Sequence, residues 1–152
     1  MSLQAWDRVR LAASLIGLGI AAYLSALHYN PAVSPACSSS GVVNCERVLT
    51  SPQAVWNGIP VALWGLLWFA VAAMLAILSL GHHGTAEPPW LRWGGIGWAM
   101  TGAAVVLRLL YTELGVIGRL CLWCTAVHVL VIGLFAVQIL RDAIHTSTSR
   151  DP

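Results

Sequence analysis

Four long apolar stretches dominate this sequence and limit what it can fold into. They cover residues 11–29, 59–80, 90–111 and 120–140, and we expect only a short turn at residues 112–119 between the last two. A helix needs roughly 20 mostly apolar residues to cross the hydrocarbon core of a bilayer. Only 9% of the residues are charged, against about 25% in a typical soluble domain. The sequence therefore predicts an all-α membrane protein, in which four transmembrane helices form a single domain over residues 1–152.

The arginine residues indicate how these spans are oriented. All eight basic residues are arginine. The side of the two termini and of the loop of residues 81–89 has five: Arg8, Arg10, Arg92, Arg141 and Arg150. The other side has three: Arg47, Arg108 and Arg119. Because basic residues concentrate on the cytoplasmic side, we expect both termini in the cytoplasm and the long loop of residues 30–58 outside. The net charge of +2 is explained by the membrane, and we expect no nucleic-acid partner.

Cys121 and Cys124 form a C-x-x-C motif at the start of the fourth span. Residues three apart lie on one face of a helix, so the two sulfur atoms can come within bonding distance. Free N–H groups and the positive dipole end at a helix N-terminus favour a thiolate, and Arg119 lies two residues earlier. The pattern favours a reactive dithiol. A structural disulfide or two small buried apolar residues are the alternatives.

A second pair, Cys37 and Cys45, lies in the long Ser-rich loop. A disulfide there would close a small loop that can still move, which suits thiol–disulfide exchange; a static staple is the alternative. We expect no metal, because structural zinc sites use shorter cysteine spacings. All four cysteine residues would face the outer, oxidising compartment. Two pairs on one side predict a relay, in which one pair meets a soluble partner and the other passes two electrons to a lipid-soluble acceptor.

The order of these motifs resembles the vitamin K epoxide reductase family, in its bacterial disulfide-forming branch. The likeness rests on the loop cysteine pair, on Ser51 six residues after the second cysteine, on the Gly-Ile-Pro-Val-Ala-Leu-Trp-Gly run of residues 58–65, and on the final C-x-x-C. It extends from the first span to the last. Another type of four-helix, quinone-linked disulfide oxidase carries its C-x-x-C in the first outer loop, which reverses the order found here.

The resemblance implies a role for each cysteine residue. Cys37 would exchange with a thioredoxin-fold partner, and Cys45 would exchange with Cys121. Cys124 would face a quinone of the menaquinone, ubiquinone or vitamin K type, and Ser51 would supply an active-site hydroxyl. Many bacterial relatives carry a fused thioredoxin domain. This chain has none, so we expect a separate partner on the outer side.

The resemblance also suggests which residues surround the quinone. Val48 and Leu49 would close the pocket from the loop. Val61 stands where vertebrate members have an asparagine that contacts the quinone, and His128 stands where they have a tyrosine.

Physical arguments leave alternatives open for several of these residues. Ser51 precedes Pro52, and capping of a helix by its hydroxyl explains it as well as catalysis does. His128 lies one turn after the C-x-x-C motif, where it can meet a quinone carbonyl; a histidine with partners inside the bundle is the alternative. Trp64 and Trp68 are four apart and can wall a flat ring, although aromatic residues at helical spacing more often serve ordinary packing.

Together these features predict a membrane thiol:quinone oxidoreductase that supports disulfide bond formation. Reduction of vitamin K epoxide or quinone is one alternative, and a non-enzymatic scaffold with structural disulfides is another. Transport is disfavoured, because the middle of the spans is nearly all apolar apart from His128. The expected location is the bacterial inner membrane with the active site facing the periplasm or exterior, or the endoplasmic reticulum membrane in a eukaryote.

Overall fold

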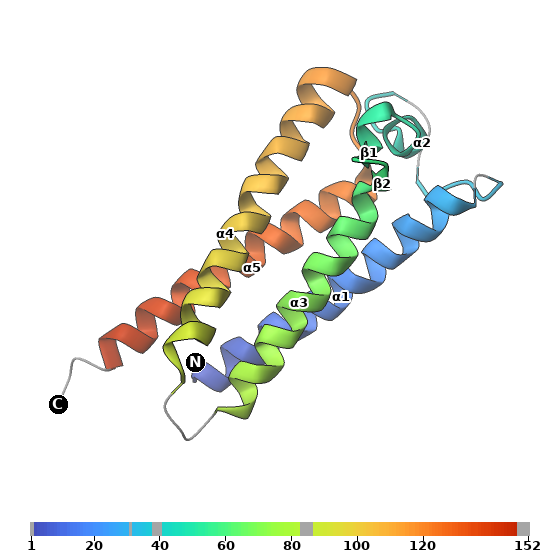
Figure 1. The fold of residues 1–152 in the computed structure, drawn as a ribbon. Helices are drawn as coiled ribbons and strands as arrows, with labels where there is room; N and C mark the ends of the chain where they lie inside the picture. Colours follow the sequence, from blue (N-terminus) through green and yellow to red (C-terminus); the bar gives the residue numbers. More distant parts are fainter. Residues whose placement is uncertain (1, 31, 38–40, 83–86, 149–152) are drawn as a thin grey trace.

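Four long helices form an up-and-down bundle (Figure 1). The structure, a computed structural model, describes residues 2–30, 32–37, 41–82 and 87–148. The long helices are α1 (Leu3–Tyr29), α3 (Val61–Gly81), α4 (Pro89–Tyr111) and α5 (Leu122–Thr148). Each is long and apolar enough to cross a membrane. The predicted all-α, four-helix membrane architecture is confirmed.

The short elements gather at one end of the bundle, which we call the cysteine end (Figure 1). They are the helix α2 (Cys45–Leu49), the single turn η1 (Pro52–Ala54), the antiparallel strands β1 (Val55–Trp56) and β2 (Ile59–Pro60), and the π-helix η2 (Thr112–Ile117). The start of α1, the end of α3, the start of α4 and the end of α5 lie at the opposite end. The two cysteine pairs therefore share one end, and the described ends of the chain share the other.

The π-helix η2 continues α4 where the sequence had suggested only a short turn. Its residues are mostly apolar, so nothing in their side chains stops the helix. It ends at Gly118, whose φ of 65° lies in the left-handed region that a glycine adopts without strain. The N–H groups of Gly118 and Arg119 both point to the backbone carbonyl of Glu113. This extension fixes the residues that precede the C-x-x-C motif.

Aromatic residues and glycines pack the bundle centre. Phe69 is fully buried and lies against Gly17 so closely that a Cβ there would overlap the ring. Trp68 and Trp98 stack with ring centroids 6.3 Å apart, and each indole N–H donates to the other residue's backbone carbonyl, at 3.2 and 3.1 Å. These contacts hold α3 against α1 and α4.

Buried charges join the helices at the end opposite the cysteines, which we call the charged end. Asp7 is completely buried, and its carboxylate pairs with Arg10 and Arg141, each at 2.8 Å. Arg141 also pairs with Glu87 at 3.0 Å, and Ser79 donates to the same carboxylate at 3.0 Å. Burial alone would raise the pKa of Glu87, but the hydrogen bond and charge of Arg141 hold it below its ordinary value. The cluster ties α1, α3 and α5 to Glu87, two residues before α4.

Polar residues other than His128 are buried near the ends of the spans, outside the middle that was expected to be apolar. Ser14 and Gln138 are also buried inside α1 and α5, and the helices reach into the charged end beyond the apolar stretches. Hydropathy averaged over a window conceals such residues. Ion pairs between helices make the burial of Asp7 and Arg141 at the charged end tolerable.

Candidate active site around the cysteine residues

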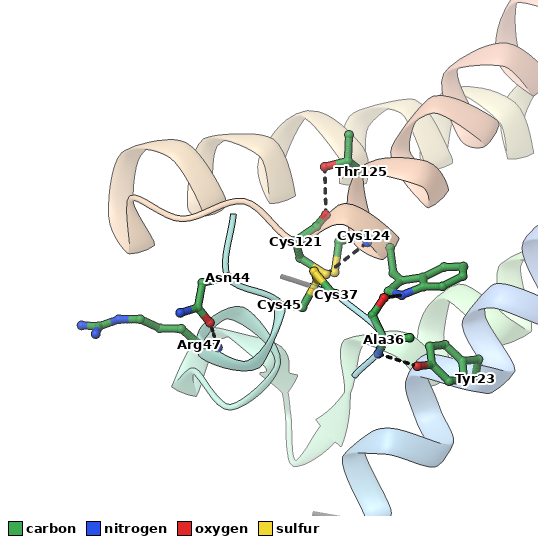
Figure 2. The surroundings of a disulfide bond; sticks show 10 residues. Tyr23, Ala36, Cys37, Asn44, Cys45, Arg47, Cys121, Cys124 and Thr125 are labelled. Carbon is green, nitrogen blue, oxygen red and sulfur yellow. Dashed lines mark hydrogen bonds between the residues drawn. A yellow bond between two sulfur atoms is a disulfide. The ribbon is translucent and has the colours of Figure 1, made fainter. Parts of the chain in front are cut away.

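All four cysteine residues meet at the cysteine end (Figure 2). Cys45 and Cys121 are buried, with 1% and 0% of their surface exposed, and they pack together with Val48. Cys37 and Cys124 lie against the same cluster and are only partly buried. A disulfide joins Cys37 to Cys45, whereas Cys121 and Cys124 are free thiols.

A backbone bridge sets the loop pair beside the C-x-x-C motif. Val43 and Leu120 form an isolated parallel bridge, in which the N–H of Asn44 donates to the Leu120 carbonyl at 2.9 Å. Cys45 and Cys121 each follow one residue after these hydrogen-bonded positions. The bridge therefore brings together two sulfur atoms that lie far apart in the sequence.

The segment before Cys37 is tethered as well. The indole N–H of Trp123 donates to the Ala36 carbonyl, and the Ala36 N–H donates to the Tyr23 hydroxyl, both at 3.1 Å. The rings of Tyr23 and Trp123 lie 5.2 Å apart, and Figure 2 shows the Tyr23 hydroxyl beside Ala36. Any movement of the loop that carries Cys37 away from the C-x-x-C motif must break these two hydrogen bonds.

The start of α5 stabilises a thiolate at Cys121. Its Sγ accepts the backbone N–H of Cys124 at 3.2 Å. The Cys121 carbonyl accepts both the N–H and the hydroxyl of Thr125, at 2.8 and 2.9 Å, which fixes the first turn. The hydrogen bond from the Cys124 thiol, followed by those from the backbone, lowers the pKa of Cys121 although burial opposes this. Cys121 is thus the more acidic thiol of the pair.

Glu113 is a residue of this site that the sequence reasoning missed. It lies in η2, and only 5% of its surface is exposed. Its carboxylate is within hydrogen-bonding reach of the Cys121 backbone N–H and the Cys124 thiol. An acidic residue inside an apolar run, eight residues before a C-x-x-C motif, is the feature that could have pointed to it.

Comparison with known families decides what kind of protein carries this arrangement. The profile of the vitamin K epoxide reductase family matches residues 8–139. The chain belongs to this family. The match reaches all four membrane helices and includes both cysteine pairs. Vitamin K epoxide reductase family proteins are membrane oxidoreductases that use quinones as electron partners, and this chain is accordingly an integral membrane oxidoreductase.

The hydroxyl that the family resemblance assigned to Ser51 does not cap a helix here. Ser51 occupies the N-cap position of η1, as expected, but its side chain makes no capping hydrogen bond. Instead the hydroxyl donates to the Val48 carbonyl at 2.7 Å. The capping explanation of the hydroxyl was therefore wrong. This bond secures the end of α2, where Leu49 is half-buried.

The expected quinone neighbours on α3 lie in different surroundings. Val61 is half-buried at the first residue of α3. Trp64 is 40% exposed and its ring lies 6.3 Å from that of Trp56. Trp68 belongs to the bundle core and stacks on Trp98. The structure therefore does not bring Trp68 into the cysteine cluster.

His128 is buried, with 3% of its surface exposed. Its Nδ1 has no hydrogen-bond partner among the described residues. Bundle side chains thus do not satisfy this nitrogen, contrary to the alternative of a histidine paired inside the protein. A buried ring nitrogen without a partner suits a ligand with a carbonyl group.

An open apolar groove of about 450 Å³ runs along α1 and ends at Ala36 and Trp123. Its other lining residues are Leu15, Ile16, Gly19, Ile20 and Tyr23. None of the residues expected to contact the quinone lines it. Within the described part of the chain, no group of three or more His, Cys, Asp or Glu side chains is placed to hold a metal ion.

Proposed function

We propose that this protein is a thiol:quinone oxidoreductase that oxidises a thioredoxin-fold partner through its two cysteine pairs. The proposal rests on one observation. The oxidised Cys45 packs against the buried Cys121, whose sulfur is held as the more acidic thiol of its pair. Two redox-active pairs in contact can exchange electrons by thiol–disulfide exchange with little backbone movement.

Cys37 is the sulfur that a soluble partner can reach, because Cys45 is buried. A partner thiolate that attacks Cys37 breaks the Cys37–Cys45 bond and leaves the electron pair on Cys45. The second thiol of the partner then attacks the mixed disulfide. The partner leaves with a disulfide, and the chain keeps two reduced sulfurs.

The second exchange moves the electrons to the C-x-x-C motif. The Cys45 thiolate attacks Cys121 of a Cys121–Cys124 disulfide, and Cys124 leaves with the electron pair. Cys37 then attacks Cys45, which re-forms the loop disulfide and releases Cys121. The product has an oxidised loop pair and a reduced C-x-x-C, and this is the redox state of the present structure.

The residues present fit a quinone, which when bound would accept two electrons and two protons. Cys124 and His128 would hold it from successive turns of α5, and the unpartnered Nδ1 of His128 suits one carbonyl oxygen. Leu49, Val61 and Trp64 stay in the proposal as apolar walls. Trp68 is left out, because its indole is already engaged with α4.

We propose that the cysteine end faces the outer side of the membrane and that the charged end faces the cytoplasm. The arginine distribution supports this orientation. The disulfide supports it independently, because disulfides persist on the oxidising side of a membrane. The partner would then be a periplasmic or extracellular protein.

The test is reduction of a water-soluble quinone by purified protein in detergent, with a dithiol as electron donor. Wild-type protein should reduce the quinone, and Cys124→Ala should not. The variant should instead accumulate a Cys45–Cys121 disulfide, seen as a linked peptide without reductant. His82→Ala, at the charged end, is the control and should keep the wild-type rate. Wild-type rates in Cys124→Ala would overturn the electron path, and cysteine pairs that never cycle in alkylation assays would indicate a scaffold.

A further inference from the structure

The proposed relay requires a proton at one particular atom. When Cys124 leaves the Cys121–Cys124 disulfide it carries the electron pair as a thiolate, and it must gain a proton to become the thiol present here. When the pair is oxidised again, that proton must leave. Cys124 is only partly accessible, so a group beside its sulfur is needed to take and return the proton.

Glu113 is in position to do this. Its carboxylate lies beside the Cys124 thiol and the Cys121 backbone N–H, and its Oε2 is buried. The backbone contact comes from the motif itself, so it fixes the carboxylate relative to the reacting sulfur. The acid is 5% exposed, which keeps bulk water from replacing it as the proton acceptor.

The Cys124 proton has two possible acceptors. The thiol also lies within hydrogen-bonding reach of the Cys121 sulfur, and two negative charges so close together repel each other. Cys121 and Glu113 can therefore share a single negative charge. When one of them carries the charge, the other is protonated. Such sharing lets the proton move between sulfur and oxygen without a large change in geometry.

The unused carboxylate oxygen points to the same conclusion. Oε2 of Glu113 is buried and has no hydrogen-bond partner in the described part of the chain. A buried charged oxygen without a partner is costly, so a carboxylate left here after Glu113 gives up its proton takes the proton back readily when the dithiol is oxidised. Arg119 does not neutralise the acid, because its guanidinium donates to the Gly118 carbonyl instead.

We propose that Glu113 is a catalytic proton acceptor and donor for Cys124, an inference that rests on the function proposed above. As Cys124 is expelled from the Cys121–Cys124 disulfide, the Glu113 carboxylic acid gives its proton to the new thiolate. When the dithiol gives two electrons to the quinone, the S–S bond re-forms, the Cys124 proton returns to the carboxylate, and the two protons that the quinone takes up come from water. One S–H bond is made and broken per cycle, and Glu113 ends as it began.

The π-helix explains how the chain places this carboxylate. A π turn widens the helix locally and is found often at functional sites. Here it holds Glu113 at the end of α4, while Gly118 reverses the chain and brings the C-x-x-C motif back against it.

The test compares Glu113→Gln with wild type, using the full chain in detergent. The dithiol donor and water-soluble quinone are those of the previous assay. Glu113→Gln should slow quinone reduction at least tenfold, in the range known for general acid–base catalysis. Exchange at the Cys37–Cys45 disulfide with a small thiol should keep its rate. Glu113→Asp should recover part of the activity and shift the pH profile. Glu46→Gln, an exposed carboxyl next to Cys45, is the matched control and should behave as wild type.

The outcomes separate this inference from the function it rests on. If wild type fails to reduce quinone, the proposed function falls. If wild type is active and Glu113→Gln matches it, the role of Glu113 falls alone. Should Glu113→Gln not fold, infrared difference spectra of the wild type between its two redox states give the answer. A change in the carboxyl C=O region, absent in a Cys124→Ser variant, is expected, and no change would overturn the proposal.

Discussion

The tether around Ala36 leads to a quantitative prediction about access to Cys37. Two hydrogen bonds hold this segment, one from Trp123 and one to Tyr23. Trp123→Phe and Tyr23→Phe each remove one bond and keep most of the ring contact. A hydrogen bond of this kind contributes about 1 kcal/mol net, which corresponds to roughly a fivefold change in an equilibrium.

Each single variant should therefore raise the open population of the Cys37 segment by about fivefold, and the double variant by roughly 30-fold if the effects add. Hydrogen exchange of peptides that contain Ala36 measures the opening directly. The rate at which a small thiol attacks Cys37 should rise in parallel. The bridge between Val43 and Leu120 is untouched, so protection around Cys45 should not change.

Tyr29→Phe is the matched control, because Tyr29 is 62% exposed near the end of the same helix. It should leave both exchange and thiol attack as in wild type. If the double variant exchanges like wild type at Ala36, these hydrogen bonds do not govern the loop. Faster exchange without faster attack on Cys37 would show that opening is not what admits the partner.

Three further predictions concern other parts of the bundle. His128→Phe should lower quinone turnover about tenfold while partner exchange continues, and His128→Tyr should recover much of the loss; wild-type turnover in His128→Phe would make the residue a packing element. Gly102→Ala should lower the free energy of unfolding by about 1–3 kcal/mol, because a Cβ would overlap the Trp68 indole. Gly97→Ala should leave it unchanged, because a Cβ there meets no neighbour. Arg141→Met should lower the free energy of unfolding by about 3–5 kcal/mol, because it leaves Asp7 with one partner fewer. Adding Asp7→Asn should restore part of this free energy, as measured by unfolding in detergent.

The four spans and the C-x-x-C at a helix start could be predicted because both depend on local sequence. Apolar length gives the spans, and three-residue spacing gives the shared face of Cys121 and Cys124. The meeting of Cys45 with Cys121 could only be supplied by the family resemblance. It depends on a backbone bridge between Val43 and Leu120. Backbone hydrogen bonds require no particular side chains, so the sequence does not reveal this bridge.

Other features of the site were hidden for physical reasons. Glu113 was assigned to a turn because helices were expected to end with the apolar stretch, yet the chain adds a π turn before Gly118. Capping of the helix that follows was one of two open explanations for the Ser51 hydroxyl. It donates instead to the carbonyl of Val48 in the preceding helix, and both partners are compatible with the same local sequence.

The charged end has a consequence for the order in which the chain assembles. Asp7 and Arg141 are separated by 134 residues, so α1 is synthesised long before its guanidinium partner on α5. Until α5 is synthesised, Asp7 lacks this partner, whereas Arg10 on the same helix already pairs with it. Burying a carboxylate without its full set of partners is costly, which keeps the start of α1 near the aqueous boundary during insertion. The bundle therefore closes at this end last, and a chain released before residue 141 would remain open there.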